Sequence, residues 1–346
     1  MSKRQVQIGN IQLGGGVIAV QSMTTEKTSD VKNSVAQILR LEEAGCDIAR
    51  VAVLDEEDAR AISLVKSQVH IPIVADIHFS AKLAVLAVES GADKLRINPG
   101  NIGGERELKL VSDCVKAHKI PVRVGANTGS IEPNYLKKYG RSAAALVESA
   151  LYNVALLEKN GINDIVISVK ASSVPLTVEA YELLAKRTEY PLHLGVTEAG
   201  TERMGIIKSS IGIGSLLLKG IGDTIRVSLT SDPVKEVYAA HDILRACGLE
   251  KDYVEVVSCP TCGRCQYDCM ELAEKVNARV RTVRKPLKIA VMGCVVNGPG
   301  EAKDCDLGIA GGGEYCAIFR KGEVLERVES SRAEQKFFER LEELLQ

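Results

Sequence analysis

The sequence predicts an α/β protein in which a (β/α)₈ barrel is followed by a small α/β domain. Over roughly the first 230 residues, short β-branched runs alternate with longer amphipathic runs, and eight runs of the first kind can be counted. A short polar segment then interrupts the pattern. Seven of the ten cysteines follow that segment, between Cys259 and Cys316.

The eight β-branched runs predict the barrel strands. In the segments between them, apolar residues recur three and four positions apart, as in Glu107–His118 and Ala143–Asn160, which predicts helices with one buried face. The alternative, a doubly wound sheet, normally uses five or six strands, and no Gly-x-Gly-x-x-Gly follows the first run. The predicted strands are Val17–Val20, Ile48–Val53, Ile71–Ile77, Lys94–Ile97, Pro121–Val124, Asp164–Val169, Leu192–Val196 and Asp223–Val227.

The segment Gly248–Asp252 predicts a linker between a barrel domain, residues 1–247, and a second domain, residues 253–346. The same patterns predict four strands and two helices in the second domain, with a further strand pairing as a hairpin. These elements are strands Tyr253–Val257, Leu287–Met292, Leu307–Ala310, Tyr315–Arg320 and Val324–Val328, and helices Gln266–Ala278 and Ser330–Leu345.

Composition excludes several classes of protein. Lys and Arg number 44 against 45 Asp and Glu, so the chain has no basic excess with which to bind nucleic acid in general. There is no Trp and there are four Phe, which argues against a platform for stacking bases. No apolar run reaches the roughly 18–20 residues of a membrane span, and the first residues lack the apolar core of a signal peptide. We expect a cytoplasmic protein with neither a nucleic-acid nor a membrane partner.

Catalytic groups in such barrels project from the carboxyl ends of the strands. Five of the eight ends supply a cation, and five cations at one mouth repel each other unless an anion lies between them. Arginine binds phosphate oxygens through two hydrogen bonds, so the sequence predicts a small, highly anionic ligand such as a diphosphate. Two acids, Asp76 and Glu198, are candidates for hydrogen bonding or proton transfer. The strand ends carry Gln21 and Ser22, Arg50, Asp76 and His78, Arg96 and Asn98, Arg123 and Asn127, Ser168 and Lys170, Glu198, and Arg226 and Ser228.

In a cytosolic chain, the clustered cysteines indicate a metal site in preference to disulfides. Two ligand sets are open. The first is the run Cys259, Cys262, Cys265 and Cys269, whose spacing is that of ferredoxin-type iron–sulfur sites. The second combines Cys259 and Cys262 with Cys294, which stands in a turn after a predicted strand. Structural zinc is an alternative for either set.

Two motifs in this region resemble the 4-hydroxy-3-methylbut-2-enyl diphosphate synthase family: Cys-Pro-Thr-Cys-Gly-Arg at 259–264 and Gly-Cys-Val-Val-Asn-Gly-Pro-Gly-Glu-Ala at 293–302. Segments 20–24, 75–79, 96–100, 168–172 and 196–200 of the predicted barrel agree with this resemblance. It extends from about residue 4 to the carboxyl terminus and corresponds to the compact bacterial form, a barrel plus a cluster domain.

The resemblance implies reductive opening and dehydration of 2-C-methyl-D-erythritol 2,4-cyclodiphosphate in isoprenoid precursor synthesis, with flavodoxin or ferredoxin as electron donor. It also implies a [4Fe–4S] cluster held by Cys259, Cys262, Cys294 and Glu301; the family does not require Cys265 and Cys269. We expect catalytic roles for Glu198, Asp76 and Glu301. We expect substrate contacts from Arg50, His78, Arg96, Asn98, Arg123, Asn127, Lys170, Arg226, Ser228 and Asn297.

Two other functions remain open at this point. A transferase of the pterin-barrel type with a structural zinc would keep the anion site, whereas a pure electron carrier would need no convergent cations.

Topology also predicts an assembly. The helical segment Pro233–Cys247 runs about 22 Å away from the mouth, and the linker spans at most about 17 Å. We therefore expect a head-to-tail homodimer in which each cluster domain serves the partner's barrel.

Overall fold

The computed structural model describes residues 2–265, 267–294 and 302–346. The chain divides into two compact units, residues 1–249 and 250–346, which are described separately. Among the described helices, none is both long and apolar enough to cross a membrane.

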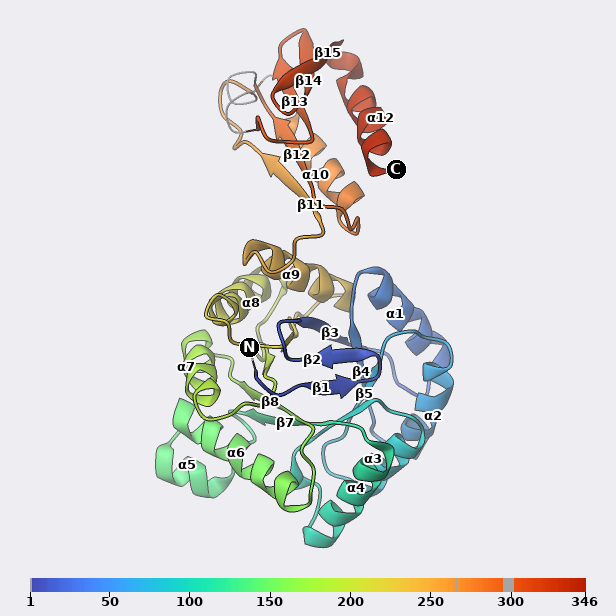
Figure 1. Ribbon diagram of the computed structural model, residues 1–346, viewed down its shortest axis with the longest axis vertical. Helices are drawn as coiled ribbons and strands as arrows, with labels where there is room; N and C mark the ends of the chain where they lie inside the picture. Colours follow the sequence, from blue (N-terminus) through green and yellow to red (C-terminus); the bar gives the residue numbers. More distant parts are fainter. Residues whose placement is uncertain (1, 266, 295–301) are drawn as a thin grey trace. The chain divides into compact units, whose positions relative to one another are not determined.

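The first unit is the predicted barrel of eight parallel strands (Figure 1). The strands pair in the order β8-β7-β6-β5-β4-β3-β10-β9. A bridge between Ile167 on β8 and Leu192, just before β9, joins the two ends of this series. The strands are β3 (Ala19–Met23), β4 (Ile48–Ala52), β5 (Ile73–Asp76), β6 (Lys94–Ile97), β7 (Val122–Asn127), β8 (Ile165–Lys170), β9 (His193–Leu194) and β10 (Thr224–Ile225).

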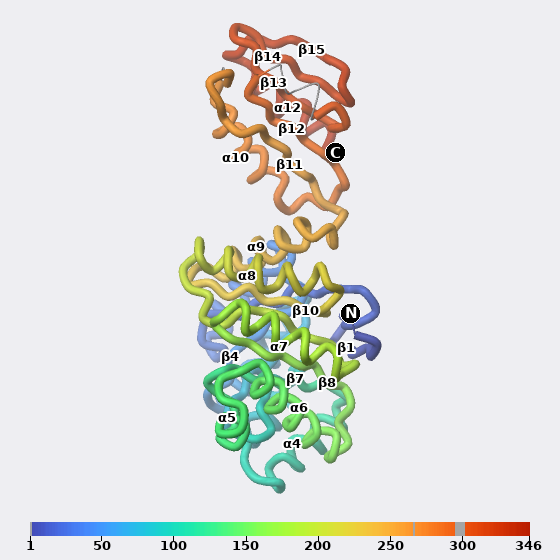
Figure 2. Tube along the Cα trace, turned by 90° about the vertical axis from the view of Figure 1, so that its left-hand side faces the viewer, coloured from blue at the N-terminus to red at the C-terminus, as the bar shows by residue number. Residues whose placement is uncertain are grey.

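Helices cover the outside of the barrel, and Figure 2 shows α9, α8, α7, α6 and α4 following one another along this unit. Most begin at a Ser or Asp whose side chain accepts a hydrogen bond from the first turn, as Ser80 and Asp55 do. The helices are α1 (Val31–Glu43), α2 (Glu56–Lys66), α3 (Ala81–Glu89), α4 (Glu105–His118), α5 (Pro133–Tyr139), α6 (Ala143–Lys159), α7 (Val174–Ala185), α8 (Glu202–Leu217) and α9 (Pro233–Ala246), with a 3₁₀ turn at Pro99–Asn101.

A hairpin that the sequence patterns did not predict closes the amino end of the barrel (Figure 1). Its strands, β1 (Val6–Ile8) and β2 (Ile11–Leu13), pair antiparallel. Val6, Ile8 and Leu13 are buried in one apolar cluster with the first residues of barrel strands, including Ile48 and Val74. Apolar side chains of the hairpin and of the barrel strands therefore close this end of the barrel interior.

The second unit has a five-stranded sheet in the order β11-β12-β13-β14-β15, parallel for the first three strands and antiparallel for the rest. Apolar residues of both helices pack on the face of the sheet that carries Ile289 and Ile309. The helix after the cysteine run begins at Cys269, later than the predicted start at 266, a position outside the described residues. The elements are β11 (Val254–Ser258), α10 (Cys269–Val280), β12 (Leu287–Met292), β13 (Leu307–Gly312), β14 (Tyr315–Arg320), β15 (Glu323–Glu329), a 3₁₀ turn at Ser330–Arg332 and α12 (Ala333–Leu345).

Candidate active site

A cavity of about 130 Å³ lies at the carboxyl ends of the barrel strands, where enzymes of this fold place their active sites. All five cations from the strand ends line it, together with one carboxylate, one imidazole and small polar side chains. The lining residues are Arg50, Asp76, His78, Arg96, Arg123, Asn127, Ser168, Lys170, Thr197, Arg226 and Ser228.

Asp76 is the centre of an ion-pair network in this cavity. Its carboxylate lies 3.5 Å from Arg50 Nη2, 3.3 Å from Arg96 Nη1 and 3.5 Å from His78 Nε2. Burial alone would raise the pKa of Asp76, but Arg50, His78, Arg96 and Arg123 together hold it well below its usual value. Asp76 is thus an ionised group that orients two arginines, and it is poorly suited to donate a proton at neutral pH.

For three of the cations, the cost of burial exceeds the stabilisation that nearby carboxylates provide. Burial lowers the pKa of Arg50 to about 10, and burial together with neighbouring cations lowers the pKa values of Arg123 and Lys170. The Nε atoms of Arg123 and Arg226 are buried and have no hydrogen-bond partner in the described part of the chain. Buried donors of this kind are costly unless something accepts from them, so the cavity is built for an anion.

The positive interior extends beneath the cavity. Lys94, the first residue of β6, is fully buried, and its amine lies 3.5 Å from the Gln21 side-chain oxygen. Burial, Arg123 and Arg50 lower the pKa of Lys94. Lys94 was not among the predicted site residues, because the prediction considered the carboxyl ends of the strands and Lys94 stands at the amino end of β6.

A glycine, Gly195, leaves the space that the Lys170 side chain occupies at the cavity wall. A Cβ at Gly195 would lie 2.7 Å from Lys170 Nζ and 2.7 Å from the Arg226 carbonyl oxygen. Glycine at this position therefore allows the Lys170 amine to reach the cavity wall just after β9.

Of the predicted catalytic and substrate-binding residues, Asn98 and Glu198 do not line the cavity, and Asn297 and Glu301 lie outside the described residues. Asn98 is buried, and its side-chain oxygen accepts a hydrogen bond of 3.3 Å from the N–H of Gly125, which joins the end of β6 to the middle of β7. Glu198 is exposed and has a φ of 50°, a strained conformation for a residue with a side chain. Asn297 lies among residues 295–301, outside the described residues. Conversely, Thr197 lines the cavity and was not among the predicted residues.

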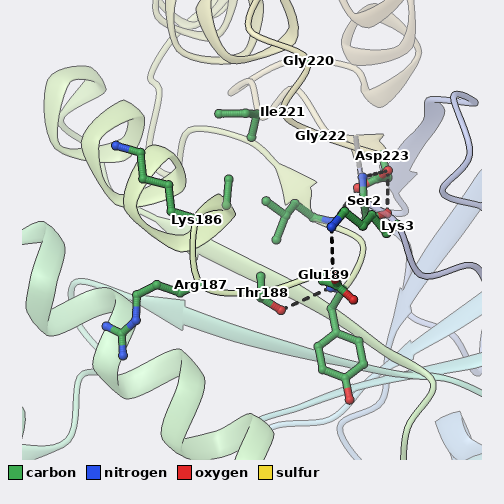
Figure 3. Close-up of a pocket in the computed structure, with 13 residues that line it drawn as sticks. Ser2, Lys3, Lys186, Arg187, Thr188, Glu189, Gly220, Ile221, Gly222 and Asp223 are labelled. Carbon is green, nitrogen blue, oxygen red and sulfur yellow. Dashed lines mark hydrogen bonds and ion pairs between the residues drawn. The ribbon is translucent and has the colours of Figure 1, made fainter.

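A second and larger hollow, about 510 Å³, lies at the opposite end of the barrel (Figure 3). It is formed by the segments that precede β9 and β10, together with Ser2 and Lys3. The Asp223 carboxylate accepts hydrogen bonds from Ser2 and from the Leu192 N–H, and Lys3 pairs with Glu189. Because its acidic groups are already paired and it lies at the amino ends of the strands, this hollow is not the candidate active site.

Two cysteines of the second unit lie at the same edge of its sheet. Cys259 follows β11 and Cys294 follows β12, and because these strands are parallel neighbours their ends lie at the same edge. The Gly293 N–H donates a hydrogen bond of 3.1 Å to Cys259 Sγ, a contact typical of sulfur atoms that ligate iron–sulfur clusters. Cys262, three residues after Cys259, is exposed. Glu301 lies outside the described residues.

The two extra cysteines of the run lie against the same edge. A Cβ on Gly293 would be 2.6 Å from Cys265 Sγ, so that thiol lies close to the Cys259 contact. Cys269 is buried at the start of α10, where its thiol donates to the Val291 carbonyl at 3.5 Å and burial raises its pKa to about 11. Cys269 therefore packs between α10 and β12, with Cys259 and Cys265 as neighbours. Among the described side chains, no three that could ligate a metal are arranged as a metal-binding group.

Comparisons with known proteins match both units. The model of the GcpE TIM-barrel domain matches residues 3–241, and that of the GcpE protein C-terminal domain matches residues 255–343. The chain is 55% identical over 344 residues to the 4-hydroxy-3-methylbut-2-en-1-yl diphosphate synthase (flavodoxin) of Caldanaerobacter subterraneus subsp. tengcongensis, covering 99% of this chain and 97% of that protein. It is 52% identical over 348 residues to the enzyme of the same name from Desulfotalea psychrophila, covering 99% and 96%.

Among solved structures, dihydropteroate synthase from Stenotrophomonas maltophilia is similar, with a TM-score of 0.53 and 16% identity over 70% of this chain and 97% of that chain. At this identity the likeness shows a shared barrel fold alone. The family models, which together span most of the chain, and the relatives above 50% identity confirm the resemblance of the cysteine and barrel motifs. The chain belongs to the GcpE family.

Proposed function

We propose that this chain reduces 2-C-methyl-D-erythritol 2,4-cyclodiphosphate to 4-hydroxy-3-methylbut-2-enyl diphosphate. The observation that carries the proposal is the convergence of five buried or half-buried cations on one small cavity. A cyclic diphosphate brings two adjacent phosphates, whose oxygens match several arginine forks at once. The names of the relatives support the same product.

The chemistry explains why a cationic cavity is needed. The substrate gains two electrons, the bond between a ring carbon and a phosphate oxygen breaks, and a hydroxyl takes up a proton and leaves as water. The diphosphate released from that carbon carries one more negative charge than it had in the ring. Arg50, Arg96 and Arg123 stabilise this charge as it develops.

Two acids divide the remaining work. Asp76 holds Arg50 and Arg96 in place and stays ionised. Glu198, on the strained segment after β9, is the carboxyl group that either donates the proton or balances developing positive charge. The pH dependence of a Glu198→Gln variant separates these roles, because only loss of a proton donor removes the basic limb of the profile.

We further propose that a [4Fe–4S] cluster is held by Cys259, Cys262, Cys294 and Glu301. The contact of Gly293 with Cys259 and the shared sheet edge of Cys259 and Cys294 support this ligand set. When bound, the cluster supplies electrons one at a time, and a carboxylate on the fourth iron is a more exchangeable ligand than a thiolate. Flavodoxin, named in the relatives, is the proposed donor.

The proposed working form is a head-to-tail homodimer. Helix α9 starts at the mouth of the barrel and ends at Ala246, about 21 Å further along its axis. The second unit begins at residue 250, so the chain leaves the barrel at the end opposite the cavity. A partner chain related by a two-fold axis supplies the cluster to each cavity, and the two contacts close the assembly.

The proposed function is tested with protein purified without oxygen. Its absorption spectrum, iron and sulfide content are measured, and the cyclodiphosphate is incubated with reduced flavodoxin while products are followed by mass spectrometry. The expected result is a brown protein that forms 4-hydroxy-3-methylbut-2-enyl diphosphate. A colourless zinc protein, or a brown one that leaves the cyclodiphosphate unchanged, contradicts the proposal.

A further inference from the structure

Glu236, in the first turn of α9, is a buried carboxylate beside the cavity that neither the motifs nor the strand ends revealed. Its exposure is 4%. One oxygen, Oε2, lies 3.1 Å from Ser22 Oγ and 3.4 Å from Arg226 Nη2. The other, Oε1, accepts a hydrogen bond of 2.9 Å from the Leu229 N–H. A carboxylate removed from water in this way is stable only because each of its oxygens has donors.

The three donors belong to adjoining parts of the mouth. Ser22 lies on β3, and Arg226 immediately follows β10, its parallel neighbour. Leu229 lies three residues beyond Arg226, and Ser228, between them, lines the cavity. Glu236 therefore fixes both ends of the segment 226–229 that carries two of the cavity's polar side chains.

The contact with Arg226 uses only part of the guanidinium. Nη2 faces Glu236, whereas the Nε atom is buried and has no hydrogen-bond partner in the described chain. A guanidinium held along one edge by a carboxylate keeps its other N–H groups free for an anion. Without that carboxylate, repulsion from neighbouring cations such as Arg50 would favour other rotamers of Arg226.

We propose that Glu236 is a positioning residue: it holds Arg226 and the segment bearing Ser228 so that both face the anionic group of the substrate. This inference rests on the proposed function for the identity of the substrate. The positioning role itself requires only that the cavity binds an anion. Inorganic pyrophosphate therefore tests that role whatever the natural substrate is.

The test is Glu236→Gln, which keeps the size of the side chain and an oxygen for Leu229 but removes the charge. The expected result is a rise of about tenfold in KM for the cyclodiphosphate with kcat changed less than about twofold, because binding and not the reacting bond is affected. The dissociation constant of pyrophosphate, measured by calorimetry, should rise by a similar factor. The matched control is Glu202→Gln, whose half-buried carboxylate contacts Lys235 and Ser231, neither of which lines the cavity.

A double-mutant cycle shows whether Glu236 acts through Arg226. In an Arg226→Ala background, Glu236→Gln should weaken pyrophosphate binding by less than about twofold, because the residue it positions is gone. Equal effects in both backgrounds, or a Glu236→Gln variant that binds pyrophosphate as tightly as the native chain, would overturn the proposal. Should Glu236→Gln not fold, Glu236→Asp moves the carboxylate away from Arg226 and is read in the same cycle. A native chain that binds pyrophosphate but leaves the cyclodiphosphate unchanged overturns the proposed function and leaves this comparison valid.

Discussion

Asp76 and Arg96 stand opposite each other in the register of β5 and β6, and the Asp76 Oδ1 atom lies 3.3 Å from Arg96 Nη1. The neighbouring strand places Arg123 opposite Arg96 in turn. Three consecutive strands thus bring a carboxylate and two guanidinium groups to one level of the barrel interior. Because backbone pairing fixes this arrangement, the anion site is formed before any ligand arrives.

The first prediction concerns Asp76. Replacing it with Asn leaves Arg50 and Arg96 buried without their carboxylate, and we expect a loss of about 3–5 kcal/mol in the free energy of unfolding at pH 7. Urea unfolding measures this loss. The control is Asp252→Asn, which removes an exposed carboxylate. Equal stabilities of the native chain and Asp76→Asn would contradict the ion-pair network.

The pH dependence of that stability follows from the depressed pKa of Asp76. A carboxyl whose pKa is lowered by folding contributes stability that is fully present above its ordinary value of 3.8 and is lost as pH falls toward the folded value. Between pH 5 and pH 8 the Asp76 contribution should therefore be constant. Unfolding curves collected from pH 5 down to about pH 3 should fall less steeply for Asp76→Asn than for the native chain.

The second prediction concerns the cations themselves. Arg50→Ala or Arg123→Ala should lower kcat/KM for the cyclodiphosphate by the equivalent of about 2–4 kcal/mol for each bidentate contact removed. The visible spectrum should not change, because the proposed cluster ligands belong to the other unit. Arg60→Ala is the control, since that side chain is exposed on α2, where it pairs with Glu56, and does not line the cavity. Normal turnover by both cavity variants would show that the anion site lies elsewhere.

The third prediction separates the two sets of cluster ligands. Cys294→Ser should lose the visible absorption and the bound iron, whereas Cys265→Ala and Cys269→Ala should keep both. Cys269 lies in the packing of α10, so its replacement is expected to lower thermal stability while iron content is retained. Iron and sulfide analysis of the three purified variants provides the measurement. A brown Cys294→Ser protein beside a colourless Cys265→Ala protein would instead assign the ferredoxin-type run.

The barrel was predictable from the sequence because its strands are buried on both faces and read as continuous β-branched runs. The strand boundaries were harder to predict. Strands β9 and β10 contain two residues each, although longer apolar runs surround them. The hairpin of β1 and β2 was missed since its few apolar residues gain their burial only from the barrel end that they cover.

The anion site was largely predictable for a different reason. The rule that strand ends meet at one mouth converts positions in sequence into neighbours in space, and it placed all five cations. The rule does not identify residues that lie near the mouth but belong to helices or other segments. Glu236 stands in the first turn of a helix, where a carboxylate is ordinary because it favours the helix dipole. Only the folded chain shows that its partners are Ser22 and Arg226.

The last prediction tests the head-to-tail dimer by complementation. An Arg50→Ala chain has a defective cavity and an intact cluster site, and a Cys294→Ser chain has the reverse. When one cavity and the partner's cluster form each active site, a mixed dimer contains one site with both lesions and one with neither.

Co-expression with two different affinity tags allows the mixed dimer to be purified away from both parents. Its activity per dimer should approach half that of the native protein, whereas each parent dimer is nearly inactive. A dimer of two Arg50→Ala chains prepared with the same tags controls for their effect. If cavity and cluster of one chain formed the site, neither chain of the mixed dimer would be intact, and purified mixed dimers would be as inactive as their parents.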